Sequence, residues 1–470
     1  MLVALAGLGV LLSLAHRLSA DEGQILTGAW NLYNGQELYR DFFEFIGPAS
    51  FTWVGGFFRV FGPSYWVALL ASQTLLLMSI WAFFLCSRLL IEHRPTALAT
   101  SAIWVLIATT PPFINHNSYS SFLASAFLLM MIRTLKTRRL IDAFLAGVLG
   151  GVTVFFLQPK GGILLIVGLV TLPWLGMKSV GDAFGGTRVE SGPAGSRDLP
   201  GRRSIIAPLV ASYLGGAAVV GVTGLVFWGL NPAQAVFSMA RGTVAMNHLS
   251  LSYLPLLGFL SIAGLIGFAS QREGLLDSVG KLLVAIQAGL WLSTAHLPDL
   301  WHLWINSFPL LLMVGRLGGR SLNRPLAPAV RGVIAGLFGI VLMAGVGQSV
   351  VRNLDHTRVT RSWISGLNDV LGGEEFFAFT FLPSFYLEFR VPNPYYNSVL
   401  YVGNHPPEHF QRNLETLSDR RPPFVLLDYA SVEKYGHTLE NPIDRFLRRN
   451  YRRAQSIPHG QGTIEVWERL

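Results

Sequence analysis

An acidic pair, Asp21 and Glu22, follows directly after the first apolar segment of the chain. The opening residues, MLVALAGLGVLLSLA, carry no charge, and a third acid, Asp41, lies further along the same juxtamembrane loop. Charged side chains at a membrane edge are costly unless they face water or a partner, so such carboxylates are functional candidates. Their chemistry suits a general base that activates an acceptor hydroxyl beside an activated donor.

The same acids also have structural interpretations, which the sequence leaves open. Asp21 has the side chain of a helix N-cap, and Glu22 would interact favourably with the positive N-terminus of the following helix. These roles are compatible with catalysis, because a cap is a rigid mount for a carboxylate. Asp41 follows Arg40 directly and would form a local ion pair with Arg40 or with Arg59.

A lysine in a glycine-rich turn is the candidate ligand for a phosphate group. Lys160 lies in the segment QPKGG at 158–162, between two apolar runs. Glycines let backbone N–H groups approach a ligand, and lysine is a mobile point charge suited to phosphate. The alternative is that the side chain snorkels to the membrane interface.

Two polar groups in other loops are candidates for binding substrate. His296, Asp299 and His302 lie in the segment HLPDLWH, and His116 is followed by Asn117. The first group has the residue types of a metal site, but we favour hydrogen bonding to a phosphate or a sugar, with interfacial packing as the alternative. We therefore assign no metal ligands, and the use of a divalent cation stays open.

Composition indicates a multispanning membrane protein. Hydrophobic residues make up 51% of the 470 and charged residues only 13%, whereas a soluble domain carries about 25% charged residues. The net charge of +9 lies mostly in short loops between apolar runs rather than in one patch, so we expect no nucleic-acid partner. The single cysteine, Cys86, excludes an intrachain disulfide and a cysteine metal cluster.

The apolar runs predict a mainly α-helical, polytopic fold with about eleven spans. A span needs about 20 mainly apolar residues. The candidates lie at 1–18, 65–91, 96–111, 121–134, 140–157, 161–177, 205–229, 253–270, 280–296, 303–317 and 328–348.

Lys and Arg are concentrated in alternate loops, which orients the chain because basic residues favour cytoplasmic loops. The basic loops include the long Gly-, Ser- and Pro-rich segment 178–204, which reads as a flexible cytoplasmic linker. The same rule places Asp21, Glu22, Asp41, Lys160 and Asp299 together on the outer side. The first outer loop, 19–64, shows two stretches with helical spacing of apolar residues, which predict amphipathic helices at the membrane interface.

After about residue 350 the chain becomes more charged and lacks spanning runs. We predict a transmembrane domain at 1–350 and a small extracytoplasmic α/β domain at 351–470. Strand-like segments lie at 376–383, 398–403, 422–429 and 463–470, and helix-like segments lie at 412–419 and 441–453.

The order of these features resembles the GT-C superfamily of polytopic glycosyltransferases. The resemblance rests on the many predicted spans, on Asp-Glu after the first span, and on the segment GQELYRDF at 35–42 followed by Gly-Pro. The later turns that contain Lys160 and Pro-Asp299 also fit the family. The similarity is clearest over about 15–165. The chain is most similar to the bacterial branch that includes the family 39 protein O-mannosyltransferases and the lipid A aminoarabinose transferases.

This resemblance implies an inverting transfer of a sugar from a polyprenyl-phosphate donor to an outer acceptor hydroxyl, on a lipid, glycan or protein, at the bacterial inner membrane. Asp21 would take the position of the base, with alignment of the family's base to Glu22 as the alternative. Lys160 and His302 would hold the donor phosphate. Loop 112–120 lacks a second acidic motif, which leaves Asp41 or Asp299 as the second acid and puts a metal site in doubt.

Two other classes of function compete with a transferase. A transporter or flippase of lipid-linked sugars should show internal repeats and charged, broken helices at mid-membrane, and no such repeat is visible. A non-catalytic protein of envelope-glycan assembly would need no converging acid and lysine. Convergence of Asp21, Asp41 and Lys160 would favour the transferase.

Overall fold

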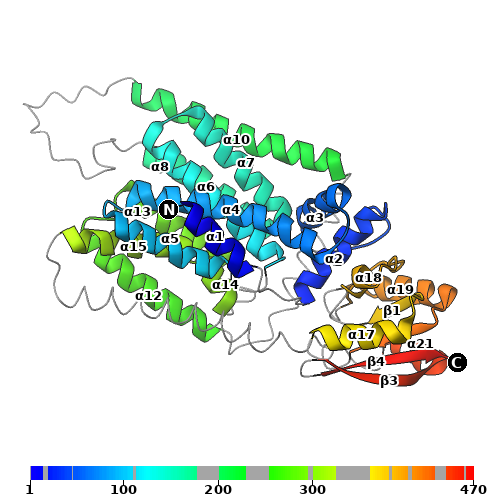
Figure 1. The fold of residues 1–470 in the computed structure, drawn as a ribbon. Helices are drawn as coiled ribbons and strands as arrows, with labels where there is room; N and C mark the ends of the chain where they lie inside the picture. The colour runs from blue at the N-terminus through cyan, green and yellow to red at the C-terminus, as the bar shows by residue number, and fades with distance from the viewer. Residues whose placement is uncertain are drawn as a thin grey trace, which may run out of the picture.

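A computed structural model describes residues 2–13, 20–44, 46–109, 113–176, 201–228, 253–294, 300–323, 360–379, 384–400, 405–428, 441–459 and 462–470. The chain folds into a large helical part and a smaller part that contains a β-sheet, and helices α2 and α3 lie between the two (Figure 1). The first ten of the predicted spans overlap helices, and the eleventh, 328–348, lies outside the described residues.

The helices of the larger part run alongside one another in a bundle (Figure 1). They are α1 (Leu2–Ser13), α4 (Tyr65–Leu90), α5 (Arg94–Ala108), α6 (His116–Thr137), α7 (Leu140–Phe156), α8 (Gln158–Gly176), α10 (Gly201–Trp228), α12 (Tyr253–Arg272), α13 (Ser278–Leu292), α14 (Leu300–Ile305) and α15 (Phe308–Asn323).

Three of the described helices, α4, α6 and α10, are long and apolar enough to cross a membrane, and several shorter apolar helices accompany them. The most apolar window of α6 is 94% buried inside the protein, whereas that of α10 is 17% buried. Helix α6 is therefore central to the bundle, and α10 presents apolar side chains outward, as a helix facing lipid does. The residues at the N-terminus of α6 are consequently well placed to meet several neighbours.

The predicted span 303–317 is interrupted. Helix α14 ends at Ile305 and α15 begins at Phe308, because Pro309 in the first turn of α15 lacks the N–H that a continuous helix needs. Side chains support the break: Gln287 Nε2 donates to the carbonyl of Asn306, and Asn306 Nδ2 donates to the carbonyl of His302. The interruption places His302 on a short separate helix.

The two predicted helices of the first outer loop are present as α2 (Ala20–Tyr33) and α3 (Pro48–Phe61). Pro48 occupies the first turn of α3, where a missing N–H is harmless. Helix α2 is buried on all sides over 22–31, rather than on the single face that amphipathic spacing predicts. Residues of the C-terminal part cover the second face: Trp30 Nε1 donates to the carbonyl of Val391 at 2.9 Å.

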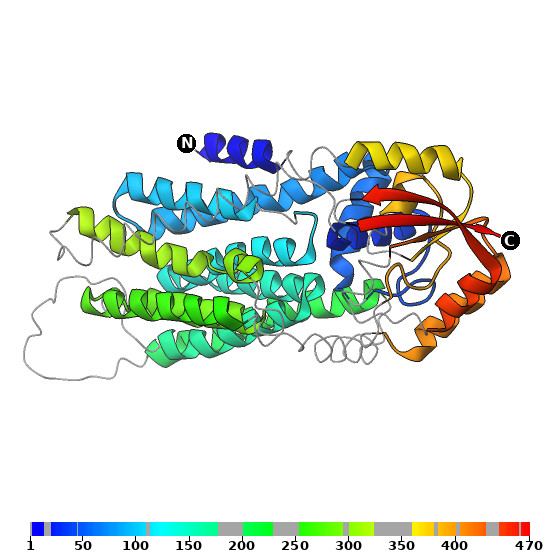
Figure 2. The same cartoon turned by 90° about the horizontal axis from the view of Figure 1, so that it is seen from below.

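The C-terminal part contains a four-stranded mixed sheet in the order β1-β2-β4-β3. This part lies at one end of the molecule, beyond the helical bundle (Figure 2). Strands β1 and β2 are parallel, with Phe376 opposite Phe424, and β4 is antiparallel to both β2 and β3. The elements are α17 (Thr360–Leu371), β1 (Phe376–Phe379), α18 (Phe385–Glu388), α19 (Pro407–Arg420), β2 (Phe424–Leu427), α21 (Pro442–Asn450), β3 (Tyr451–His459) and β4 (Gly462–Arg469).

Three of the four predicted strand segments contain strands β1, β2 and β4. Within the fourth, 398–403, the described residues 398–400 form no strand, and the rest lie outside the described residues. The predicted helix 441–453 is too long: it ends at Asn450, and its last residues begin β3. Sequence reasoning missed β3 because this edge strand is largely exposed and carries no alternation of apolar and polar residues.

The membrane orientation is a prediction that fusions can test. Since basic residues favour cytoplasmic loops, a reporter that is active only in the cytoplasm should be active when fused near residue 190. The same reporter should be silent when fused after residue 360. The reverse pattern would overturn the placement of every candidate residue on the outer side.

Candidate functional site

Glu22 connects α2 to the segment that leads into α6. Its side chain is completely buried, and Oε1 accepts hydrogen bonds from the backbone N–H of Phe113 at 2.8 Å and of Ile114 at 3.1 Å. Hydrogen bonds to an ionised acceptor are stronger than neutral ones. The carboxylate therefore fixes the chain just before α6 against the first helix of the outer loop.

Helix α6 begins with a group of polar side chains. Asn115 is the N-cap, and its Oδ1 accepts from the backbone N–H of Asn117 at 2.7 Å. The Nδ2 atom of Asn117 lies 3.0 Å from Nε2 of His116 and 3.2 Å from Nε2 of His302. An amide nitrogen carries two hydrogens, so it can donate to Nε2 of both rings. Asn117 thus brings two histidines from α6 and α14 together.

Lys160 lies beside this group. It is completely buried in the first turn of α8, and its Nζ donates to the carbonyl of Asn117 at 3.1 Å and to Oγ of Ser121 at 2.7 Å. Both partners are neutral, and no ion pair of Lys160 occurs among the described residues. A buried charge without a counter-ion is costly. The arrangement therefore suits an anionic ligand that would complete the site.

Two further polar residues link the lysine to the histidine. Ser121 Oγ lies 3.0 Å from Oδ1 of Asn306 and donates to it, and Asn306 Nδ2 donates to the carbonyl of His302 at 2.8 Å. A closed ring of contacts therefore joins Lys160, Ser121, Asn306, His302 and Asn117. Sequence reasoning missed Ser121 and Asn306, although a polar residue inside a predicted span is itself a signal of function.

A glycine beside Lys160 allows α8 to begin close to the end of α7. A Cβ atom at Gly161 would lie 2.1 Å from the backbone nitrogen of Val154, whereas a Cβ at Gly162 would meet nothing within 4 Å. The backbone of α7 cannot yield as a flexible side chain does, so Gly161 fixes the position of the neighbouring lysine.

We expect Gly161→Ala to destabilise the protein by about 1–3 kcal/mol, as overpacking does. Gly162→Ala is the matched control and should be neutral or stabilising by up to about 1 kcal/mol, because alanine is the better helix former. Thermal unfolding of the two variants in detergent measures the difference. Equal melting temperatures would show that the close approach of α7 and α8 is not required.

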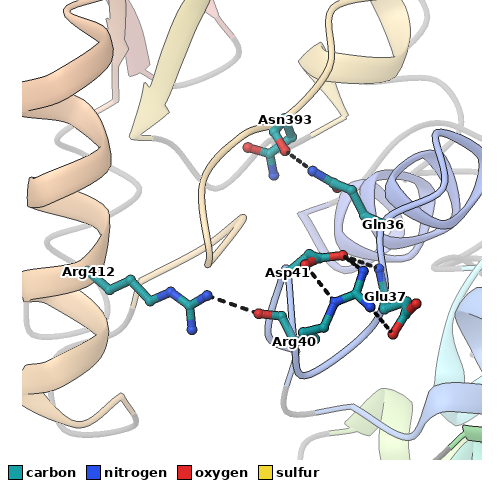
Figure 3. A network of polar contacts seen from close by, with 6 residues as sticks. All are labelled: Gln36, Glu37, Arg40, Asp41, Asn393 and Arg412. Carbon is teal, nitrogen blue, oxygen red and sulfur yellow. Dashed lines mark hydrogen bonds and ion pairs between the residues drawn. The ribbon is translucent and has the colours of Figure 1, made fainter.

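Asp41 lies apart from this group of residues. Its carboxylate pairs with Arg40 and accepts from the backbone N–H of Glu37 (Figure 3). The Arg40 guanidinium holds the pKa of Asp41 below its ordinary value, and the Glu37 N–H acts in the same direction. The local ion pair that the sequence offered as the alternative is therefore present, with Arg40 rather than Arg59 as the partner.

For three other predicted site residues, the structure describes the backbone alone or does not describe the residue. Asp21 is the second residue of α2, in its first turn rather than at its N-cap, and its side chain lies outside the described set. His296 and Asp299 also lie outside the described residues. Over the described ranges, no group of three or more His, Cys, Asp or Glu side chains is arranged to hold a metal ion.

Sequence reasoning overlooked a buried acid in the first outer loop. Glu44 is 2% exposed, accepts from Nε2 of Gln24 at 2.5 Å, and also accepts from Oγ of Ser398. It lies three residues beyond Asp41 and has the same formal chemistry. Nothing in the sequence distinguishes the exposed acid from the buried one, because the burial depends on C-terminal residues distant in the chain.

Comparison with known proteins gives a likeness in structure only. No protein-family model and no curated protein matches the sequence. Among solved structures, ArnT from Cupriavidus metallidurans bound to undecaprenyl phosphate is similar, with a TM-score of 0.58 and 14% identity over 99% of this chain and 97% of that one. ArnT from the same organism in the apo state gives a TM-score of 0.51, with the same identity and coverage. The chain therefore has the fold of ArnT, in agreement with its resemblance to the GT-C aminoarabinose transferases.

Proposed function

We propose that this protein is a membrane glycosyltransferase that moves a sugar from a polyprenyl-phosphate donor to an acceptor hydroxyl on the outer side of the bacterial inner membrane. The observation that carries the proposal is the burial of Lys160 with two neutral partners. The same helix turn that accepts its hydrogen bond is connected to two histidines and, through the preceding residues, to Glu22. A cation, neutral donors and an acid thus belong to one continuous group.

The lysine suits the leaving group of such a reaction. As the glycosidic bond breaks, the phosphate leaves as a monoester and gains charge, so a fixed cation stabilises the transition state more than the ground state. Because Lys160 is buried, its attraction for the phosphate is less weakened by water than it would be at an exposed site. His302 adjoins Nζ through shared partners and would orient the phosphate oxygens, while Asn117, whose Nδ2 hydrogens are directed at His116 and His302, holds that histidine in place.

The acid pair suits the acceptor side. The attacking hydroxyl must lose its proton as it bonds to the anomeric carbon, on the face opposite to the leaving phosphate, which gives inversion. Asp21 is the base in this proposal, because the Oε1 atom of Glu22 already accepts two backbone hydrogen bonds. Glu22 would hold the entrance to α6 while its neighbour accepts the proton.

The structural neighbour supports the lipid partner. ArnT from Cupriavidus metallidurans was solved bound to undecaprenyl phosphate, and this chain has the same fold over nearly its full length. A polyprenyl phosphate combines the anion that suits Lys160 with an apolar tail that suits a helical bundle with outward-facing apolar side chains. An undecaprenyl-phosphate sugar is therefore the donor to test.

The decisive experiment is mass spectrometry of envelope lipids and glycans from cells that carry the wild type or Asp21→Asn. A transferase predicts the loss of a sugar from one class of product and the accumulation of its lipid-linked donor. If the products stay unchanged while the protein moves a lipid-linked sugar across vesicles, the protein is a transporter. If the products stay unchanged and the protein moves no lipid-linked sugar across vesicles, a non-catalytic role in envelope-glycan assembly replaces the proposal.

A further inference from the structure

The first outer loop is joined to the C-terminal part by backbone and side-chain hydrogen bonds. The backbone N–H of Phe43 donates to the carbonyl of Tyr396 at 2.6 Å. Gln36 Nε2 donates to the carbonyl of Asn393 at 2.8 Å (Figure 3). These residues are separated by about 350 positions in the chain. The loop after α2 is therefore folded onto residues 391–400 and does not stand alone.

An arginine of α19 closes the outer edge of this contact. Arg412 lies over the ring of Tyr396, with Cζ 3.7 Å from the ring centroid. It also donates to the carbonyl of Arg40 at 2.9 Å (Figure 3). The stacking is a cation–π contact at the protein surface. The edge is thus held by contacts that do not depend on a carboxylate.

Glu44 lies at the inner end of the same contact and touches both sides of it. One carboxyl oxygen accepts from Gln24 on α2, and the other accepts from Ser398. Gln24 is two residues after Glu22, on the helix that carries the acid pair. A single carboxyl group therefore joins the site helix to the C-terminal residues, and both of its side-chain partners are neutral.

We propose that Glu44 is a positioning residue that, in its protonated form, holds α2 and its acid pair against the C-terminal residues 391–400. Its influence on transfer rests on the proposed function, but its influence on the contact does not. A neutral carboxyl group can satisfy both partners: with the proton on Oε1, the hydrogen bond with Ser398 reverses and Oε1 donates to Oγ, while Oε2 still accepts from Nε2 of Gln24. An ionised carboxylate would be a buried charge whose side-chain partners are both neutral, which weakens the contact.

The pKa of this carboxyl agrees with the geometry. Burial raises the pKa of Glu44 from an ordinary 4.5 to about 7, against the opposing effect of the hydrogen bonds from Ser398 and Gln24. A group whose pKa is higher in the contact than outside it stabilises the contact fully below about pH 4.5. That stabilisation falls as the pH rises through about 7 and is absent well above it.

Tyr39 and His409, the buried titratable groups nearest to Glu44, do not reproduce this behaviour. Burial and the charge of Glu44 raise the pKa of the Tyr39 hydroxyl, so it stays neutral. Burial lowers the pKa of His409 to about 4, so that ring, which packs on Phe43, is neutral from about pH 5 upward. His405 also packs edge-on to Phe43. The charged groups Asp41, Arg40 and Arg412 lie at the outer edge of the contact. The two side chains that bind Glu44, those of Ser398 and Gln24, do not titrate.

The contact can be measured without any transfer assay. We expect amide hydrogen–deuterium exchange of residues 36–44, corrected for intrinsic rates, to show protection that falls roughly thirtyfold between pH 5.5 and 8.5. Glu44→Gln is neutral at every pH and should keep the protection while removing its pH dependence. Glu37→Gln, an exposed acid of the same loop, is the matched control and should behave as the wild type.

Three outcomes would overturn the proposal: protection that does not change with pH in the wild type, loss of protection in Glu44→Gln, or the same pH dependence in wild type and Glu44→Gln. Ser398→Ala removes the C-terminal partner of Glu44, and it should lower the protection at pH 5.5 while leaving the protein folded; unchanged protection in this variant would also overturn the proposal.

A transfer assay then separates positioning from chemistry. With an undecaprenyl-phosphate sugar, Glu44→Gln should stay active and lose the decline of turnover above pH 7, whereas an inactive glutamine variant would mean that the carboxylate itself takes part in the reaction. If the exchange results hold and the wild type itself transfers no sugar, the proposed function fails and the positioning role survives. If sugar is transferred but the protection does not depend on pH, the positioning role fails and the proposed function survives.

Discussion

Asp21→Asn is expected to leave a folded, inserted protein with turnover reduced by about 10²–10⁴-fold, the usual effect of losing a general base. Asparagine keeps the size of the side chain and removes its charge. The structural cost should be small, because a lost acid in the first turn of a helix changes stability by only about 0.3–1 kcal/mol. Turnover with an undecaprenyl-phosphate sugar and thermal unfolding should be measured on the same preparation.

The neighbouring acid supplies the control. In Glu22→Gln the amide oxygen can still accept from the backbone N–H groups of Phe113 and Ile114, so the start of α6 should keep its place. We expect a smaller loss of turnover than in Asp21→Asn. A deeper loss would make Glu22 the base. Near-normal turnover in both amide variants would leave the acidic pair purely structural and remove the main argument for an enzyme.

The helical part of the fold could be predicted because apolar runs of sufficient length mark each helix regardless of its neighbours. Prediction failed where tertiary contacts decide. The span at 303–317 is broken after Ile305, since Pro309 and the amides around Asn306 permit two short helices. Helix α2 is buried on both faces because Val391 and its neighbours cover it, and helical spacing reports only one face.

The candidate site was predictable in its residue types but not in its connections. Lys160, His302, His116 and Asn117 come from three different helices, and the structure brings them into one group. The sequence predicts that these residues lie near one another, because the alternation of basic loops assigns their loops to the same side of the membrane. Asp41 is assigned to the same side by the charge pattern and yet pairs locally with Arg40.

Glu44 shows that knowing the side of the membrane on which a residue lies does not predict its contacts. Glu44 and Asp41 belong to one short loop, and only the fold of distant residues makes one of them a buried contact and the other an exposed ion pair. Sequence spacing cannot encode the position of Ser398, which lies more than 350 residues away and covers Glu44. The first loop and the C-terminal residues must therefore be considered together in any account of the acid pair.

Lys160→Ala should weaken use of the lipid-phosphate donor by about ten- to a hundredfold, because a charge-assisted hydrogen bond is worth roughly 1.5–3 kcal/mol. Lys160→Arg should be partly tolerated, since the charge stays but the planar guanidinium differs in shape from an ammonium group. Donor concentration dependence separates weaker binding from slower transfer. The control is Lys136→Ala: its Nζ donates to the carbonyl of Leu89 away from this group of residues, and donor use should be unchanged.

Thermal stability distinguishes a ligand-binding lysine from a structural one. Lys160→Met keeps the length of the side chain and removes a buried charge that has only neutral partners. In the absence of donor we expect its melting temperature to be equal to or above that of the wild type, because functional sites often hold groups that destabilise the empty protein. Undecaprenyl phosphate should raise the melting temperature of the wild type and leave that of Lys160→Met unchanged, since only a bound ligand stabilises the folded state. A large drop in the melting temperature of Lys160→Met without donor would make the lysine a structural residue. Equal stabilisation of both proteins by undecaprenyl phosphate would exclude Lys160 from the donor site.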